Sequence, residues 1–266
     1  MVDTPATGRP LAVVTGASSG IGLELAKLCA GHGHDLIIAA DRPSEEAAAE
    51  LRANGATVES VHADLATTEG VDKLIAQIGN RPVAILCANA GHGLGHAFLD
   101  QAWDDIRHVI DTNVTGTVYL LHKLGKRMGD AGGGRILVTG SIAGYTPQPF
   151  QAVYHATKAF VDNFTIAFRE ELKPSGVVVT LLMPGATETE FFERAEMEDT
   201  KLGQMKKDDP ADVAKTGFDA LMRGDADVVH GFMNKVSTAM ADVLPAETSA
   251  RMAANQAKPG EGRKSA

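Results

Sequence analysis

Short apolar runs alternate with longer helical patterns along most of this chain. The runs are apolar throughout rather than at every second position, which indicates strands that are covered on both faces. Strands separated by helices join in parallel through right-handed crossovers. The sequence therefore predicts a single α/β domain, a doubly wound parallel sheet of about seven strands flanked by helices. The expected strands are 11–15, 35–40, 57–62, 83–88, 135–140 and 177–183, with a short one at 227–229.

Five segments between these runs are expected to be helical. On the last of them, Phe160, Phe164, Phe168 and Leu172 form an apolar stripe. Such a stripe packs in the core or against another subunit. The expected helices are 21–30, 44–53, 68–78, a long stretch at 103–128, and 152–172.

The composition excludes several classes of protein. With 266 residues, two cysteines and a formal net charge of −9, the chain is not a disulfide scaffold and lacks the positive charge that binds nucleic acid. No apolar run reaches the roughly 18–20 residues of a membrane span. Residues 1–10 lack the features of a signal peptide. We expect a soluble cytoplasmic protein without nucleic-acid or membrane partners.

The cysteines and two clustered histidines have ordinary structural interpretations. Cys29 and Cys87 lie among apolar residues and are expected to pack as small hydrophobic side chains. His92 and His96 lie in a glycine-rich segment, with no carboxylate or cysteine spaced nearby to complete a metal site. No metal site is therefore expected.

The first expected strand ends in a glycine-rich turn, Thr15-Gly-Ala-Ser-Ser-Gly-Ile-Gly22, and a helix follows at once. Glycines at 16, 20 and 22 allow a sharp turn and bring the backbone close to a ligand. The amides that open the helix then face an anionic group such as a pyrophosphate. Because a strand precedes the turn and a helix follows it, the sequence favours dinucleotide binding over an ordinary tight turn.

Further short motifs follow the later strands, and the whole set resembles the short-chain dehydrogenase/reductase family. The motifs are Asp64-Leu65, Ala88-Asn89-Ala90-Gly91, Asn113, Ser141, Tyr154-His-Ala-Thr-Lys158 and Pro184-Gly185 with Thr187. The resemblance covers residues 10–230, and the G-x-x-x-G-x-G spacing of the turn is part of it. Ala88 departs from the family pattern, which has asparagine there. The resemblance implies a Rossmann-like fold and an NAD(P)-dependent enzyme that transfers a hydride between nicotinamide and a secondary alcohol or ketone.

The resemblance also implies roles for individual residues. Tyr154 is the implied acid and base, Ser141 holds the substrate oxygen, and Asn113 supports a water relay to Lys158. Lys158 is also expected to bind the nicotinamide ribose. The implied coenzyme-binding residues are Gly16, Ser18, Ser19, Gly20, Ile21, Gly22, Asp41, Arg42, Asp64, Leu65, Asn89, Ala90, Gly91, Tyr154, Lys158, Pro184, Gly185 and Thr187.

Helix geometry supports the pairing of Tyr154 with Lys158. Residues four apart on a helix share a face. An isolated pair of this kind is more often a surface tyrosine beside a lysine, but Ser141 and the glycine turn favour the catalytic interpretation. A nearby ammonium group, together with the positive nicotinamide ring, favours the charged phenolate, so we expect Lys158 and the bound coenzyme to lower the pKa of Tyr154 from about 10.

Two neighbouring residues of opposite charge bear on the choice of coenzyme. Asp41 and Arg42 follow the second strand. An acid there binds the ribose hydroxyls of NAD, whereas an arginine binds the 2′-phosphate of NADP. Because Asp41 is present and Ser19 is not basic, NAD is expected, with NADP as the alternative.

The remaining expectations concern organisation and substrate. The chain divides into a flexible N-terminus at 1–9, a dinucleotide-binding domain at 10–244 with a substrate lid at about 186–209, and a C-terminal helix and loose tail at 245–266. By resemblance, a homodimer or homotetramer is expected. Alternative functions are a catalytically silent dinucleotide-binding scaffold or sensor, and an isomerase or epimerase that retains its NAD. The apolar residues expected to contact an apolar substrate body are Leu94, Phe98, Phe150, Phe191, Phe192, Met197 and Met205.

Overall fold

The computed structural model describes residues 8–53, 55–241 and 244–262. The expected flexible N-terminus lies outside the described residues over positions 1–7, and so do positions 263–266 of the expected tail.

Seven parallel strands form one sheet, in the order β3-β2-β1-β4-β5-β6-β7. This arrangement confirms the predicted doubly wound α/β fold. The order reverses beside β1, where β2 pairs on one side and β4 on the other. Ligands bind at the carboxyl ends of strands near such a reversal. The strands are β1 Leu11–Thr15, β2 Asp35–Ala40, β3 Val58–His62, β4 Val83–Ala88, β5 Gly134–Thr139, β6 Val177–Met183 and β7 Asp227–Val229.

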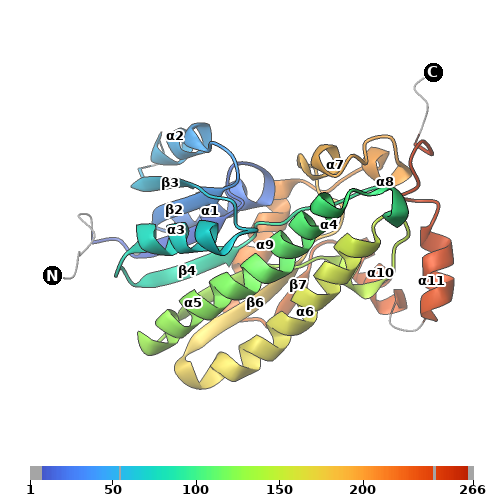
Figure 1. Cartoon of the computed structure of the whole chain (residues 1–266). Coiled ribbons are helices and arrows are strands. Elements are labelled where there is room, and N and C mark those ends of the chain that lie inside the picture. Colours follow the sequence, from blue (N-terminus) through green and yellow to red (C-terminus); the bar gives the residue numbers. More distant parts are fainter. Residues whose placement is uncertain (1–7, 54, 242–243, 263–266) are drawn as a thin grey trace.

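Helices cover both faces of the sheet (Figure 1). On β1, Leu11 and Val13 pack with one layer of helices, and Ala12 and Val14 pack with the other. Both sets of alternating side chains are therefore buried, which explains why the strands are apolar throughout. One layer holds α3 Thr68–Ile78, α5 Thr117–Asp130 and α6 Ala152–Leu172; the other holds α1 Gly20–Gly31, α2 Glu45–Ala53 and α9 Pro210–Arg223.

The apolar stripe of α6 and the two cysteines belong largely to these layers. Phe164 and Phe168 stack on each other and pack against the buried cluster of α3 and α5, whereas Phe160 is 45% exposed. Cys29 and Cys87 are buried free thiols in the opposite layer, as expected.

The long helix expected at 103–128 is interrupted in the structure. It consists of α4 Trp103–Ile110, a π-helical turn Asp111–Gly116, and α5. A Cβ on Gly116 would lie 1.9 Å from the carbonyl oxygen of Leu65, so the glycine permits a close approach to the chain after β3. Turns of this type often mark functional sites, and this one carries Asn113.

The C-terminal part packs more extensively than the expected loose tail. After α10 Phe232–Ala241 and α11 Ala246–Ala253, the chain contacts the lid, which contains the short helices α7 Phe191–Arg194 and α8 Lys201–Gln204. The amide of Leu202 donates to the carbonyl of Gln256, and the amide of Gly262 donates to that of Asp199 at 2.7 Å. Ala257 is only 1% exposed. Among the described residues, no helix has the length and apolar character needed to cross a membrane.

Candidate active site

A cavity of about 640 Å³ opens along the carboxyl ends of the strands. Its walls come from the loops that follow the first six strands and from the lid. This is the place at which the strand order predicts a ligand site. One residue from each of the six loops illustrates the arrangement: Gly16, Asp41, Asp64, Gly91, Ser141 and Gly185.

The glycine turn is built so that its backbone is unobstructed. Gly16 has a φ of +65°, and a Cβ there would lie 2.9 Å from the Cα of Ala90. Gly22 lies in the first turn of α1, and a Cβ there would lie 2.1 Å from the carbonyl oxygen of Gly16. Side chains at these positions would fill the space in which the strand, the helix and the loop after β4 meet. The turn therefore has the form of a phosphate cradle.

Thr15 and Asn89 join the ends of three strands beneath this turn. The Thr15 Oγ1 accepts hydrogen bonds from the amides of Asn89 and Ala90, at 3.0 and 3.1 Å. The Asn89 side chain donates to the carbonyl of Thr15 at 3.2 Å and accepts from the hydroxyl of Thr139 at 3.0 Å. Asn89 was predicted to bind coenzyme, and in this structure it also fixes the cavity floor.

Tyr154 and Lys158 face the same cavity from α6. The Lys158 Nζ lies 5.9 Å from the centre of the Tyr154 ring and donates to the carbonyl of Thr139 at 2.9 Å. It also lies 3.5 Å from the position that a Cβ on Gly91 would occupy. The ammonium group therefore lies beside the backbone of the loop after β4.

The protein groups around Tyr154 raise its pKa. Burial raises it to about 12, and this effect exceeds the lowering by a hydrogen bond with Ser141. The carboxylate of Asp162 raises it further. Burial lowers the pKa of Lys158 to about 8. In the chain without ligand, Lys158 therefore does not make Tyr154 acidic, and the phenol stays protonated at neutral pH.

Asp162 is a buried acid that the sequence analysis did not identify. It lies one turn beyond Lys158 on α6, so it shares the face of Tyr154 and Lys158. Its Oδ1 accepts from the amide of Ser141 at 3.3 Å, and its Oδ2 is buried without a hydrogen-bond partner among the described residues. Burial raises the pKa of Asp162 to about 7, and Lys158 opposes this rise. The i, i+4, i+8 spacing from Tyr154 was the available signal.

Ser141 and Asn113 occupy different positions relative to the cavity. Ser141 lines it and caps the turn Ile142–Tyr145 by accepting from the amide of Ala143 at 3.1 Å. Asn113 lies behind the cavity wall. Its side chain accepts from the amide of His92 at 2.7 Å and donates to the His92 carbonyl at 2.8 Å. Asn113 therefore positions the loop after β4.

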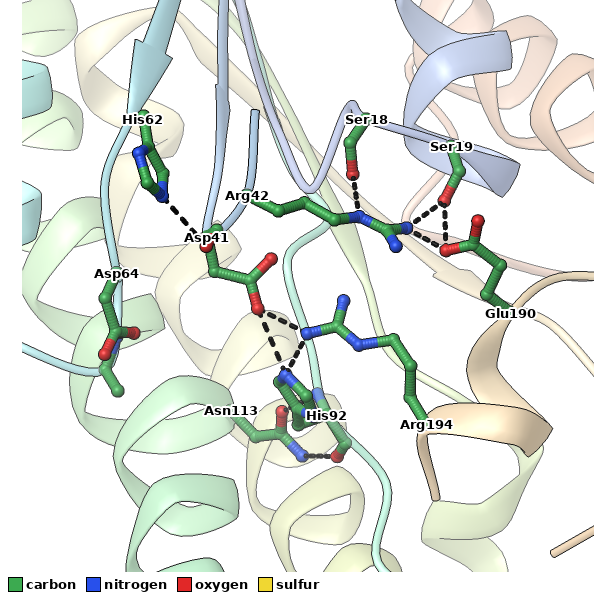
Figure 2. Close-up of polar contacts among 11 residues, drawn as sticks. Ser18, Ser19, Asp41, Arg42, His62, Asp64, His92, Asn113, Glu190 and Arg194 are labelled. Atoms are coloured by element: carbon green, nitrogen blue, oxygen red, sulfur yellow. Dashed lines mark hydrogen bonds and ion pairs between the residues drawn. The ribbon is translucent and has the colours of Figure 1, made fainter. Parts of the chain in front are cut away.

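The far end of the cavity contains a charged cluster between β2 and the lid (Figure 2). The Arg42 guanidinium donates to the hydroxyls of Ser18 and Ser19, at 3.1 and 2.9 Å. Asp41 points away from this group and accepts from His92 Nε2 at 3.3 Å and from Arg194. These two hydrogen bonds hold the pKa of Asp41 well below its usual range, and the one with His92 has the larger effect. Burial acts in the opposite direction.

The end of the cavity opposite the charged cluster is lined by the segment 186–209 and by two helices that the sequence analysis did not assign to it. Phe191, Phe192 and Met205 line the cavity as predicted, whereas Leu94 and Phe98 lie elsewhere. Met197 and Phe150 also lie outside the lining, in the apolar cluster under the lid. The unanticipated lining residues come from α10, α11 and the segment between them, and they include Asn234, Thr238, Met240, Leu244 and Met252.

The structure brings nearly all of the predicted site residues to one cavity. Gly22 and Asn113 are the two that do not line it: Gly22 packs beneath the glycine turn, and Asn113 supports the wall. The residues that do line it are Gly16, Ser18, Ser19, Gly20, Ile21, Asp41, Arg42, Asp64, Leu65, Asn89, Ala90, Gly91, Ser141, Tyr154, Lys158, Pro184, Gly185 and Thr187.

Comparisons with known proteins agree with this arrangement. A family profile described as short chain dehydrogenase matches residues 10–200. An uncharacterized oxidoreductase of Myxococcus xanthus (strain DK1622) is 35% identical over 240 residues, covering 88% of this chain and 92% of that protein. A short-chain dehydrogenase from Sphingobium yanoikuyae, solved in complex with NADPH, has a TM-score of 0.78 and 27% identity, covering 89% of this chain and 96% of that one. A bulky-bulky ketone specific alcohol dehydrogenase from Comamonas testosteroni has a TM-score of 0.73 and 25% identity, covering 89% and 95%.

Proposed function

The chain belongs to the short chain dehydrogenase family, and from this premise we propose that it interconverts a secondary alcohol and its ketone with a nicotinamide coenzyme. In this proposal Tyr154 is the acid and base. One observation carries the proposal: Tyr154, Lys158 and the glycine turn all line the same cavity. A scaffold or sensor that only binds a dinucleotide has no need of a phenol and an ammonium group beside it.

The protonated phenol suits the direction of ketone reduction. With a pKa of about 12, Tyr154 keeps its proton at neutral pH and can donate it to a carbonyl oxygen. A bound nicotinamide supplies the hydride in this direction and accepts it in the other. The charge of Lys158, 5.9 Å from the ring centre, stabilises the phenolate that remains after donation.

Ser141 is proposed to orient the substrate oxygen. Its hydrogen bond with Tyr154 lowers the pKa of the phenol, so the two groups face one another. A hydroxyl in this position can donate to an oxygen on which negative charge develops. Because the Ser141 amide is held by Asp162 and its Oγ by Ala143, the donor is fixed before substrate arrives.

The arrangement at the far end of the cavity favours NADP(H), in contrast to the expectation of NAD from Asp41. Arg42 lies against two serine hydroxyls of the glycine turn, a donor set that fits a 2′-phosphate. Asp41 is engaged by His92 and Arg194 and is not available to ribose hydroxyls. Comparing kcat/KM for NADPH and NADH tests this: a ratio above 1 supports the proposal, and a ratio well below 1 contradicts it.

The substrate is proposed to have an apolar body. Phe191, Phe192, Leu202, Met205 and Met252 line the cavity beyond Tyr154. The similar Comamonas testosteroni enzyme is described as specific for bulky-bulky ketones, which supports the same class here.

A homo-oligomer is proposed from exposed apolar side chains on two neighbouring helices. Trp103 and Ile110 on α4 are 66% and 37% exposed, and Phe160 on α6 is 45% exposed. The helices α4 and α6 pack against each other, and exposed apolar side chains on neighbouring helices are a feature of surfaces that bind a second copy. Light scattering coupled to size-exclusion chromatography measures the state directly.

The function is tested by a panel of ketones and aldehydes of graded size, followed at the absorbance band of the reduced coenzyme. Coenzyme oxidation that depends on a ketone supports the proposal. Tight coenzyme binding without turnover on any member of a broad panel would instead favour the scaffold or sensor. Product formation without net coenzyme turnover would favour the isomerase or epimerase.

A further inference from the structure

The lid reaches the coenzyme end of the cavity through two side chains of opposite charge. Glu190 and Arg194 are four residues apart at the two ends of α7, and they point toward Arg42 and Asp41 (Figure 2). Each of them forms an ion pair with the residue of opposite charge: Glu190 pairs with Arg42, and Arg194 pairs with Asp41.

The carboxylate of Glu190 lies where the donor set of Arg42 converges. Arg42 Nη2 donates both to Glu190 and to Ser19 Oγ, and Ser19 Oγ donates to Glu190 Oε2 at 3.3 Å. A guanidinium and a hydroxyl directed at one anionic oxygen form the arrangement that also binds a phosphate. Glu190 therefore occupies the place of an anionic ligand in the chain without coenzyme.

The surrounding contacts place this carboxylate over the glycine turn. A Cβ on Gly20 would lie 2.7 Å from the Cγ2 of Thr189, so the lid touches the first residue of α1 next to Glu190. Ser18, Ser19, Arg42 and Glu190 all line the cavity. An anion bound beside the turn would therefore compete with Glu190 for Arg42.

The ion pair is weak enough to exchange. The side chains of Arg42 and Glu190 are 36% and 44% exposed. Exposed pairs of this kind change an equilibrium by about fivefold at most. A phosphate group, with up to about two negative charges, competes well against a single carboxylate for the same guanidinium.

We infer that Glu190 is a specificity-determining residue of the lid, whose carboxylate competes with the 2′-phosphate of NADP(H) for Arg42. This inference rests on the proposed function. The carboxylate costs NADP(H) part of its binding free energy and leaves NAD(H), which has no 2′-phosphate, nearly unaffected.

The test compares Glu190→Gln with Glu193→Gln. Glu193 lies on the same short helix, is exposed, and makes no side-chain ion pair among the residues the structure describes. Dissociation constants for NADPH and NADH are measured by coenzyme fluorescence, and those for adenosine 2′,5′-bisphosphate by calorimetry. We expect Glu190→Gln to lower the constants for NADPH and the bisphosphate by about two- to fivefold, with NADH unchanged. Glu193→Gln should change none of them.

A second background isolates the contact. In an Arg42→Ala chain, Glu190→Gln should give no further gain, because the shared partner is gone. Unchanged or weaker NADPH binding by Glu190→Gln overturns the inference, and so does an equal gain for NADH. A wild-type chain that binds neither dinucleotide refutes the proposed function instead, so the two failures are distinguishable.

Discussion

Replacing Thr15 with valine should destabilise the fold by leaving two half-buried amides without their acceptor. Thr15 is 1% exposed, and its Oγ1 accepts from the amides of Asn89 and Ala90. Valine keeps the shape of the side chain but cannot accept. An unsatisfied buried donor costs about 1–3 kcal/mol, and because these two amides are half-buried the low end applies to each, so Thr15→Val should lower the free energy of unfolding by about 2–3 kcal/mol.

Thr15→Ser is the matched control. Serine keeps the acceptor and loses one methyl group, which costs about 1 kcal/mol. Urea denaturation followed by circular dichroism gives both values, and coenzyme titration checks the loop that holds Asn89. If Thr15→Val proves as stable as Thr15→Ser, the two hydrogen bonds do not hold the end of β4 as described.

Three further changes test other parts of the structure. The pKa of Asp162 is raised to about 7, so the folded protein holds this proton more tightly than the unfolded chain does. The protonated acid therefore stabilises the fold fully below about pH 4, and this contribution is lost as the pH rises through 7. Asp162→Asn should remove this pH dependence. Between pH 4 and pH 8 the free energy of unfolding of the variant, measured by denaturation, should rise by on the order of 4 kcal/mol relative to that of wild type. Parallel pH curves for the two proteins would contradict this prediction. Gly22→Ala should destabilise by at least about 2 kcal/mol, because its Cβ would lie 2.1 Å from the Gly16 carbonyl oxygen. Gly31 lies in the same helix with open space around it, so Gly31→Ala should be neutral or stabilising by up to about 1 kcal/mol. Equal shifts in melting temperature for Gly22→Ala and Gly31→Ala would refute the packing argument. Arg42→Ala should reduce kcat/KM with NADPH by about tenfold or more and leave NADH nearly unchanged, because a charge-assisted bond contributes about 1.5–3 kcal/mol; equal losses would contradict a phosphate site at Arg42.

Local patterns were sufficient to predict the fold and most of the residues that line the cavity. The spacing of Tyr154 and Lys158 places them on one face of any helix, and the glycine turn between a strand and a helix has few other uses. Strands that are apolar throughout required helices on both faces, as the structure has them.

Contacts between residues distant in sequence were beyond this reasoning. The pairing of Arg194 with Asp41 joins positions 153 residues apart, and no local pattern specifies it. The same holds for Met252 on α11 and for Leu244 just before it, which line the cavity although the sequence analysis did not assign them to it. The π-helical turn at Asn113 depends on the close approach of Gly116 to Leu65, which is also a tertiary contact.

The sign of the Tyr154 pKa shift could not be predicted for a related reason. A neighbouring lysine lowers the pKa of a phenol, and burial raises it. The sequence shows the lysine but not the depth of burial or the carboxylate of Asp162 nearby. Only the folded chain determines which effect is larger.

The proton-transfer role of Tyr154 is tested most directly by Tyr154→Phe, assayed for turnover and for coenzyme binding in the same preparation. Tyr119→Phe is the control, because Tyr119 donates to Asp72 on the surface, away from the cavity. We predict that Tyr154→Phe lowers kcat by about 10²–10⁴-fold and leaves the coenzyme dissociation constant within about threefold of wild type. Turnover by Tyr154→Phe close to that of Tyr119→Phe would contradict the account.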